Sequence, residues 1–210
     1  MAKKISHRYA TAEFRPYVTA LGQLALAWNE LHENLGSLFL TTMLPNRPQA
    51  GDAVFNSSLW VWHSVKSDRT QRDMLREAIE RCPWRRDKLV TDGFWLLDRA
   101  NSLSDQRNDA IHAPLFYAGK YLFGELTEGR GQVVPRFWSF NPRARKLWER
   151  ANLLAEFRYC RDTAMVLADY TKEIESSQIN LQRPWPDRPS LPIRPPKKIP
   201  PSQRRQAQPK

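Results

Sequence analysis

Three residues whose side chains suit proton transfer at an anion lie close together in the chain: Arg107, Asn108 and His112. Asn108 and His112 are four residues apart, so on a helix they are neighbours on one face. Histidine accepts and donates protons near neutral pH. Arginine keeps its charge and binds carboxylate or phosphate oxygens through paired N–H groups. The combination predicts acid–base chemistry at a negatively charged group.

Arg107 also interrupts the apolar pattern of its own helix. The other members of this stripe lie at helical spacing and are apolar: Leu89, Leu96, Ala100, Leu103 and Ile111. Burying an unpaired guanidinium costs on the order of several kcal/mol. Arg107 should therefore face a partner, an anion or a wet cleft.

A polar stripe runs beside the apolar one, formed by Asn101, Ser104, Asn108 and His112. A purely structural alternative exists for the same residues. In it, Arg107 pairs with Asp105, Asp109 or an acid of another helix such as Glu30 or Glu33, and His112 caps its own helix end.

Hydrophobic periodicity places these residues in an all-α fold. We expect the motif helix at 87–112, ended by Pro114. Further helices are expected at 17–44, at 67–82, from 141 to about 175, and less clearly at 53–65. Residues 115–140 indicate loop, with a short hairpin around 124–134. The fold class is an all-α bundle of about four or five helices.

The C-terminal part of the chain has a different composition. The 210-residue chain has a formal charge of +11, and the stretch from residue 183 onward combines nine prolines with eight basic residues and one acid. We expect a disordered arm over 177–210. Its weak candidates for RNA contacts are Arg183, Arg188, Arg194, Lys197, Lys198, Arg204 and Arg205. A solubilising tail and a Pro-x-x-P ligand are the alternatives.

Several classes of function are excluded by the sequence. No apolar run is long enough to span a membrane, and residues 1–10 lack the apolar core of a secretory signal. Cys82 and Cys160 lie far apart, so a disulfide framework and a cysteine zinc site are not expected. The segment beginning His32-Glu33 lacks the second His of a zincin and is predicted to be helix surface. We expect a cytoplasmic protein without metal or cofactor.

Residues 105–112, Asp-Gln-Arg-Asn-Asp-Ala-Ile-His, resemble the signature of the HEPN superfamily. That signature is an Arg, four to six residues, then a His, with a polar residue directly after the Arg. Here the spacer is four residues and the polar residue is Asn108. The resemblance is close in the motif and loose over the bundle. It implies a HEPN-like domain, which commonly forms homodimers. We expect this domain at 17–176, after an N-terminal extension at 1–16.

Many HEPN proteins are metal-independent RNases of toxin–antitoxin, antiphage or CRISPR systems. The resemblance implies a composite site in which Arg107 and His112 of two protomers meet, with Asn108 orienting the His or holding a phosphate oxygen. It implies RNA as substrate and an antitoxin or nucleotidyltransferase as a partner. Pro114 stands where some toxin relatives have a Tyr that a nucleotidyltransferase modifies. The alternative function is a non-catalytic helical module that binds RNA or protein through its basic tail.

Overall fold

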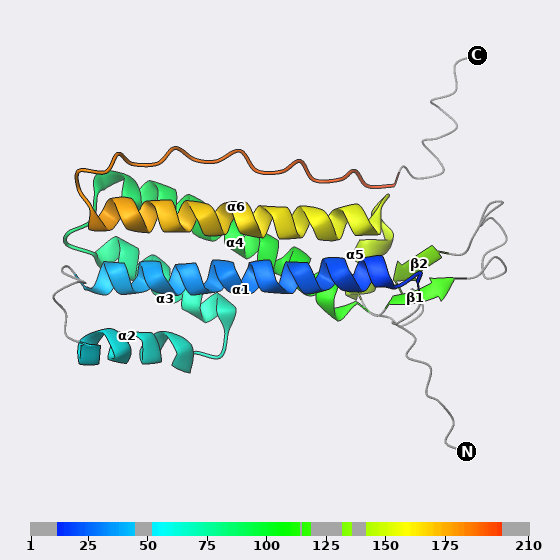
Figure 1. The fold of residues 1–210 in the computed structure, drawn as a ribbon, viewed down its shortest axis with the longest axis horizontal. Coiled ribbons are helices and arrows are strands. Elements are labelled where there is room, and N and C mark those ends of the chain that lie inside the picture. Colours follow the sequence, from blue (N-terminus) through cyan, green and yellow to red (C-terminus); the bar gives the residue numbers. More distant parts are fainter. Residues whose placement is uncertain (1–11, 45–51, 114, 119–131, 136–141, 199–210) are drawn as a thin grey trace, which may run out of the picture. The chain divides into compact units, whose positions relative to one another are not determined.

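The computed structural model describes residues 12–44, 52–113, 115–118, 132–135 and 142–198 (Figure 1). Its elements in chain order are α1 (Arg15–Met43), α2 (Asp52–Ser64), α3 (Asp68–Arg81), α4 (Asp87–His112), β1 (Leu115–Ala118), β2 (Gln132–Pro135), α5 (Pro142–Trp148) and α6 (Leu153–Ile179). The prediction of a mostly helical protein is confirmed. The described part of the chain has six helices rather than four or five.

The chain divides into two compact units, and α1, α4 and α6 each contribute to both. The bundle unit comprises residues 24–105 and 161–192. The motif unit comprises residues 1–23, 106–160 and 193–210. Within the described parts of the chain, no helix is both long and apolar enough to cross a membrane.

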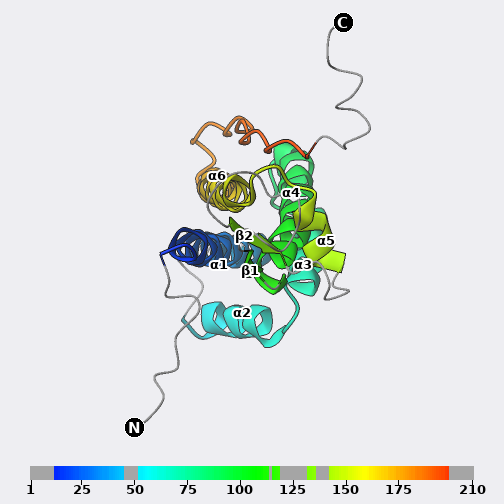
Figure 2. The same cartoon turned by 90° about the vertical axis from the view of Figure 1, so that its right-hand side faces the viewer.

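The bundle unit buries one apolar stripe from each of α1, α3, α4 and α6. Its fully buried side chains include Leu31, Leu35, Leu38, Leu75, Ile79, Leu96, Leu167 and Ile174. The helix α2 packs beside α1 (Figure 2), where the Trp62 ring lies 5.4 Å from that of Phe39. Gly36 permits this contact, because a Cβ at that position would lie 2.8 Å from the Trp62 Nε1.

The motif unit collects the end of α4, the short β-sheet, α5 and the first turns of α6. The strands β1 and β2 pair antiparallel, with Leu115 opposite Pro135. The partner of β2 is thus β1, which lies in the part of 115–140 expected to be loop and outside the hairpin expected around 124–134. Residues 119–131 lie outside the described residues. The core of this unit includes Phe14, Ala110, Val133, Val134, Leu147, Phe157 and Cys160.

The single long helix expected from 141 to about 175 is wrong, because the chain breaks after Trp148. The backbone of Arg150 forms a bridge with Lys197. Asn152 then starts α6, since its Oδ1 accepts a hydrogen bond of 3.0 Å from the Ala155 backbone N–H. A capping Asn favours a new helix start over continuation of the old one. Asn141, the residue at which the long helix was expected to begin, lies outside the described residues.

The prediction of a disordered arm from residue 177 is also wrong over the described residues. Residues 177–179 complete α6, and residues 180–198 form an extended segment with defined side-chain contacts. In the bundle unit, Trp185 and Arg188 donate to the two carboxylate oxygens of Asp92 at 2.7 and 2.6 Å. The prolines of this segment disfavour a helix and favour an extended backbone. The Asp92 carboxylate then binds two side chains of the extended segment. Residues 199–210 lie outside the described residues.

Candidate functional site

The motif occupies the last turns of α4, and its three candidate residues differ in exposure. Arg107 and Asn108 are half-buried, whereas His112 is exposed. The Arg107 Nη1 donates a hydrogen bond of 2.9 Å to the Asn108 Oδ1. The structure therefore brings Arg107 and Asn108 together. Asn108 thus orients the guanidinium, whereas the HEPN resemblance implied that it orients His112 or holds a phosphate oxygen.

A cavity of about 290 Å³ lies beside His112. His112 lines it, while Arg107 does not. The remaining lining residues come from the start of α1 and the end of α4: Phe14, Tyr17, Val18, Leu21, Ile111, Ala113 and Leu115. Burial raises the pKa of the Tyr17 hydroxyl above its usual value. At neutral pH that hydroxyl is therefore a hydrogen-bond donor at the cavity.

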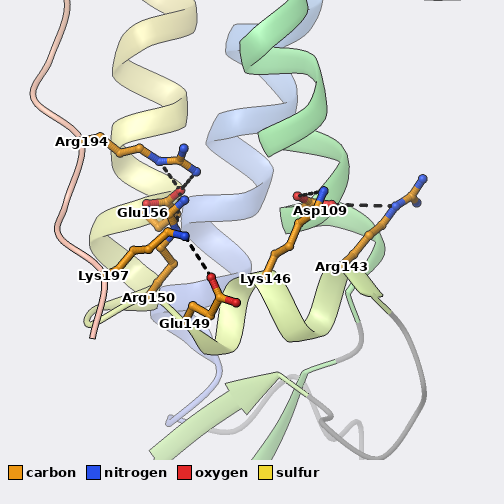
Figure 3. Close-up of polar contacts among 8 residues, drawn as sticks. All are labelled: Asp109, Arg143, Lys146, Glu149, Arg150, Glu156, Arg194 and Lys197. Atoms are coloured by element: carbon orange, nitrogen blue, oxygen red, sulfur yellow. Dashed lines mark hydrogen bonds and ion pairs between the residues drawn. The ribbon is translucent and has the colours of Figure 1, made fainter. Parts of the chain in front are cut away.

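Asp109, the acidic residue within the motif, forms ion pairs with two cations of α5 (Figure 3). Asp109 lies 3.3 Å from the Lys146 Nζ and 4.0 Å from the Arg143 Nε. Its side chain is only 13% exposed, whereas those of Arg143 and Lys146 are 45% and 65% exposed. Because a partly buried carboxylate favours a nearby cation, these ion pairs anchor the end of α4 to α5.

The other flank of the motif contacts α6. The Cys160 Sγ lies 4.0 Å from the Gln106 Oε1. Burial raises the pKa of the Cys160 thiol to about 12. The thiol is thus protonated at neutral pH and acts as a weak donor to Gln106 rather than as a nucleophile.

Four of the five described basic residues that were predicted to contact RNA are paired with acids of the same chain. In the motif unit, Arg194 donates to the buried carboxylate of Glu156, which also lies 3.4 Å from Arg150 (Figure 3). Lys197 lies 3.1 Å from Glu149 and lowers the pKa of that carboxyl. These ion pairs reduce the positive charge that the segment offers to RNA.

The remaining bases predicted for RNA contacts have varied surroundings. In the bundle unit, Arg183 pairs with Glu173, and Arg188 with Asp92. Lys198 of the motif unit lies 4.5 Å above the Trp148 ring, and burial lowers its pKa. Arg204 and Arg205 lie outside the described residues.

A second cluster of Arg, His and Asn side chains lies in the bundle unit and was missed by the sequence analysis. Arg72 of α3 is only 2% exposed. Its Nε donates to the Asn101 Oδ1 at 2.7 Å, and its Nη1 lies 3.0 Å from the His32 Nε2. A guanidinium only donates, so the His32 Nε2 accepts. This contact favours a neutral imidazole with its proton on Nδ1.

Two further side chains complete this cluster. The Trp28 Nε1 donates to the Asp68 Oδ2 at 3.1 Å, and the same oxygen lies 3.8 Å from His32. Burial lowers the pKa of Arg72, and Asp68 opposes that shift. The prediction of His32 as helix surface is wrong, because its side chain is 12% exposed. We call Trp28, His32, Asp68, Arg72 and Asn101 the buried arginine network.

The buried arginine network also accounts for part of the polar stripe on α4. Asn101 accepts a hydrogen bond from Arg72, and Ser104 is buried, with 8% of its surface exposed. Glu30, one of the acids considered for Arg107, forms an ion pair with Lys172 at 2.6 Å. Of the stripe, Asn108 and His112 remain at the motif end of α4.

Comparisons with protein-family models, with curated proteins and with solved structures give no match. The HEPN resemblance therefore rests on residues 105–112 and stays a prediction. Among the described residues, no three His, Cys, Asp or Glu side chains gather where they would hold a metal ion.

Proposed function

We propose that this protein is a metal-independent endoribonuclease that cleaves single-stranded RNA at a site completed by a second copy of the chain. One observation carries the proposal: the Arg107 guanidinium, held by Asn108, and the exposed His112 belong to the same helix end. The HEPN resemblance of residues 105–112 adds the substrate class. It also favours a toxin–antitoxin or antiphage role, with an antitoxin or nucleotidyltransferase as partner.

The proposed reaction is a transesterification within RNA. The 2′-oxygen attacks the adjacent phosphorus, the P–O5′ bond breaks, and the products are a 2′,3′-cyclic phosphate and a 5′-hydroxyl. A neutral imidazole takes the 2′-OH proton, and a protonated imidazole gives a proton to the leaving 5′-oxygen. Arg107 stabilises the negative charge that develops on the phosphorane.

The need for two protonation states argues for a homodimer. Each chain supplies one His at this helix end, and one imidazole is not both base and acid in the same step. Two His112 side chains, one from each protomer, fill both roles. Two copies of Arg107 also double the positive charge at the phosphate.

The test is cleavage of single-stranded RNA by the full chain in EDTA, with end-group analysis of the products. We expect cyclic-phosphate ends, and we expect Arg107→Ala and His112→Ala each to lower the rate by at least about 100-fold. Matched controls are Arg158→Ala and His63→Ala, which remove exposed side chains of the same types elsewhere.

Two results would contradict the proposal. Undiminished cleavage by both motif variants would place the activity elsewhere. RNA binding by the wild-type chain without cyclic-phosphate products would instead favour a non-catalytic binding module. Light scattering of the wild-type chain tests the dimer separately, because a monomer at the assay concentration contradicts the composite site.

A further inference from the structure

We infer that the cavity beside His112 is a nucleobase site, which holds the base of the nucleotide next to the cleaved phosphate. The inference rests on the proposed function for the position of that phosphate at His112. It adds what the proposed function leaves open, namely how the enzyme holds a flexible single strand in register with its catalytic groups.

The size of the cavity suits one base. Its volume of about 290 Å³ lies just below the roughly 300–1,000 Å³ that is typical of sites for drug-sized molecules. A single flat heterocycle fits such a space, whereas a folded peptide segment or a stack of several bases needs more. The occupant is therefore one planar group rather than a length of RNA.

The lining also suits a base. Phe14 is 1% exposed and lines the cavity, and Leu21 and Ile111 add apolar surface. Tyr17 supplies an aromatic ring together with a protonated hydroxyl. Bases have apolar faces that stack on aromatic rings and polar edges that form hydrogen bonds. A cavity with both kinds of group accepts a base better than a purely aliphatic ligand.

The cavity opens where the proposed chemistry takes place. Val18 is 47% exposed and His112 is exposed, and both line the cavity. A base that enters past these two residues leaves its sugar and phosphate outside, next to the imidazole. Holding the base in this way aligns the phosphate with His112 and reduces the entropy lost on reaching the transition state. Cleavage should therefore depend on the base at one position.

The experiment measures binding directly, without relying on cleavage. The four nucleoside 3′-monophosphates are titrated into the full chain by calorimetry, with ribose 5-phosphate as a ligand that has a phosphate but no base. We expect at least one nucleotide to bind about tenfold or more tightly than ribose 5-phosphate. Equal binding of all five ligands would overturn the base site.

Two variants locate the binding. Tyr17→Leu removes the ring and hydroxyl, and we expect at least about fivefold weaker nucleotide binding. Val18→Trp places a large side chain at the opening, and we expect a similar loss. Thr19→Trp is the matched control, because Thr19 is exposed on the same helix and does not line the cavity. Wild-type affinity in both cavity variants would overturn the assignment.

The base site and the ribonuclease proposal fail in different ways. Nucleotide binding that depends on Tyr17, in a chain that does not cleave RNA, would refute the ribonuclease and leave the base site standing. Cleavage with no base preference and no dependence on Tyr17 would refute the base site and leave the ribonuclease standing.

Discussion

The end of α4 and the buried arginine network use the same residue types under opposite conditions. Each has an arginine on an apolar stripe, with a His, an Asn and an Asp nearby. Arg72 is 2% exposed and is bonded to Asn101 and His32. Arg107 is half-buried, and the nearby His112 borders both solvent and a cavity. The residue types alone do not separate a structural cluster from a candidate site.

Solvent access separates the two regions. In the buried arginine network, residues of α1, α3 and α4 surround the Arg72 guanidinium, and because Arg72 is only 2% exposed a substrate phosphate in solvent does not reach it. At the end of α4, Asp109 forms ion pairs with Arg143 and Lys146 of α5. The cavity lies beside His112, which is exposed to solvent. The buried network should therefore govern stability, and the exposed end should govern activity.

The largest expected effect on stability comes from Arg72→Ala. It removes the donor on which Asn101 and the imidazole of His32 depend and leaves a space in the core. We expect a loss of about 3 kcal/mol in the free energy of unfolding. Arg107→Ala should cost no more than about 1 kcal/mol. Urea denaturation of the two variants at pH 7 measures the difference.

A matched variant tests whether hydrogen bonding by Arg72 matters beyond its volume. Arg72→Met keeps much of the side-chain volume but donates no hydrogen bond, so it should remain clearly less stable than the wild type. Equal losses for Arg72→Ala and Arg107→Ala would remove the contrast between the two regions.

A smaller effect is expected from Arg188→Ala, which tests the docked C-terminal segment. Asp92 is 7% exposed and, among the described residues, would keep Trp185 as its one side-chain donor. Leaving a buried carboxylate short of a charged donor should cost about 2 kcal/mol. Arg183→Ala is the control, because its ion pair with Glu173 is half-exposed and should contribute under about 1 kcal/mol. Urea denaturation measures both, and an undocked segment would make the two losses equal.

The sequence predicted most helix boundaries because apolar spacing and local signals agree there. Ser67 accepts from the Thr70 backbone N–H as a cap should, and α4 ends at His112, two residues before Pro114. The C-terminal segment was mispredicted for a physical reason. A composition rich in proline and basic residues indicates that the segment cannot form a core of its own. It does not indicate that the segment binds the carboxylates of Asp92 and Glu156 elsewhere in the chain.

The sequence analysis named the candidate residues of the motif but did not predict the cavity beside them. Arg107 and His112 stood out by type and spacing within one helix. The cavity did not, because Phe14 and Tyr17 lie far from the motif in sequence. Arg72 carried the same signal as Arg107, since it continues the stripe of Leu75 and Ile79 at helical spacing. Only the fold distinguishes which arginine is enclosed.

The smallest effect concerns a buried polar group without a partner, the opposite of the buried arginine network. The Tyr170 hydroxyl is buried and forms no hydrogen bond within the described residues, and burial and Asp92 raise its pKa from 10.0 to about 12. The unfolded chain therefore loses this proton at lower pH. The stabilising contribution is fully present below pH 10 and is lost as the pH rises through about 12.

Tyr170→Phe should be neutral or slightly stabilising at pH 7, by no more than about 1 kcal/mol, because it removes a hydroxyl whose burial is uncompensated. The packing of the ring against Trp95, 5.6 Å away, is retained. Between pH 10 and 12 the variant should lose less stability than the wild type, since it has no phenol to ionise. Urea denaturation at pH 7, 10 and 11 measures this. Parallel losses in both proteins would mean that the Tyr170 phenol ionises at the same pH in the folded and in the unfolded chain. The hydroxyl would then be open to solvent, and its contrast with the enclosed guanidinium of Arg72 would disappear.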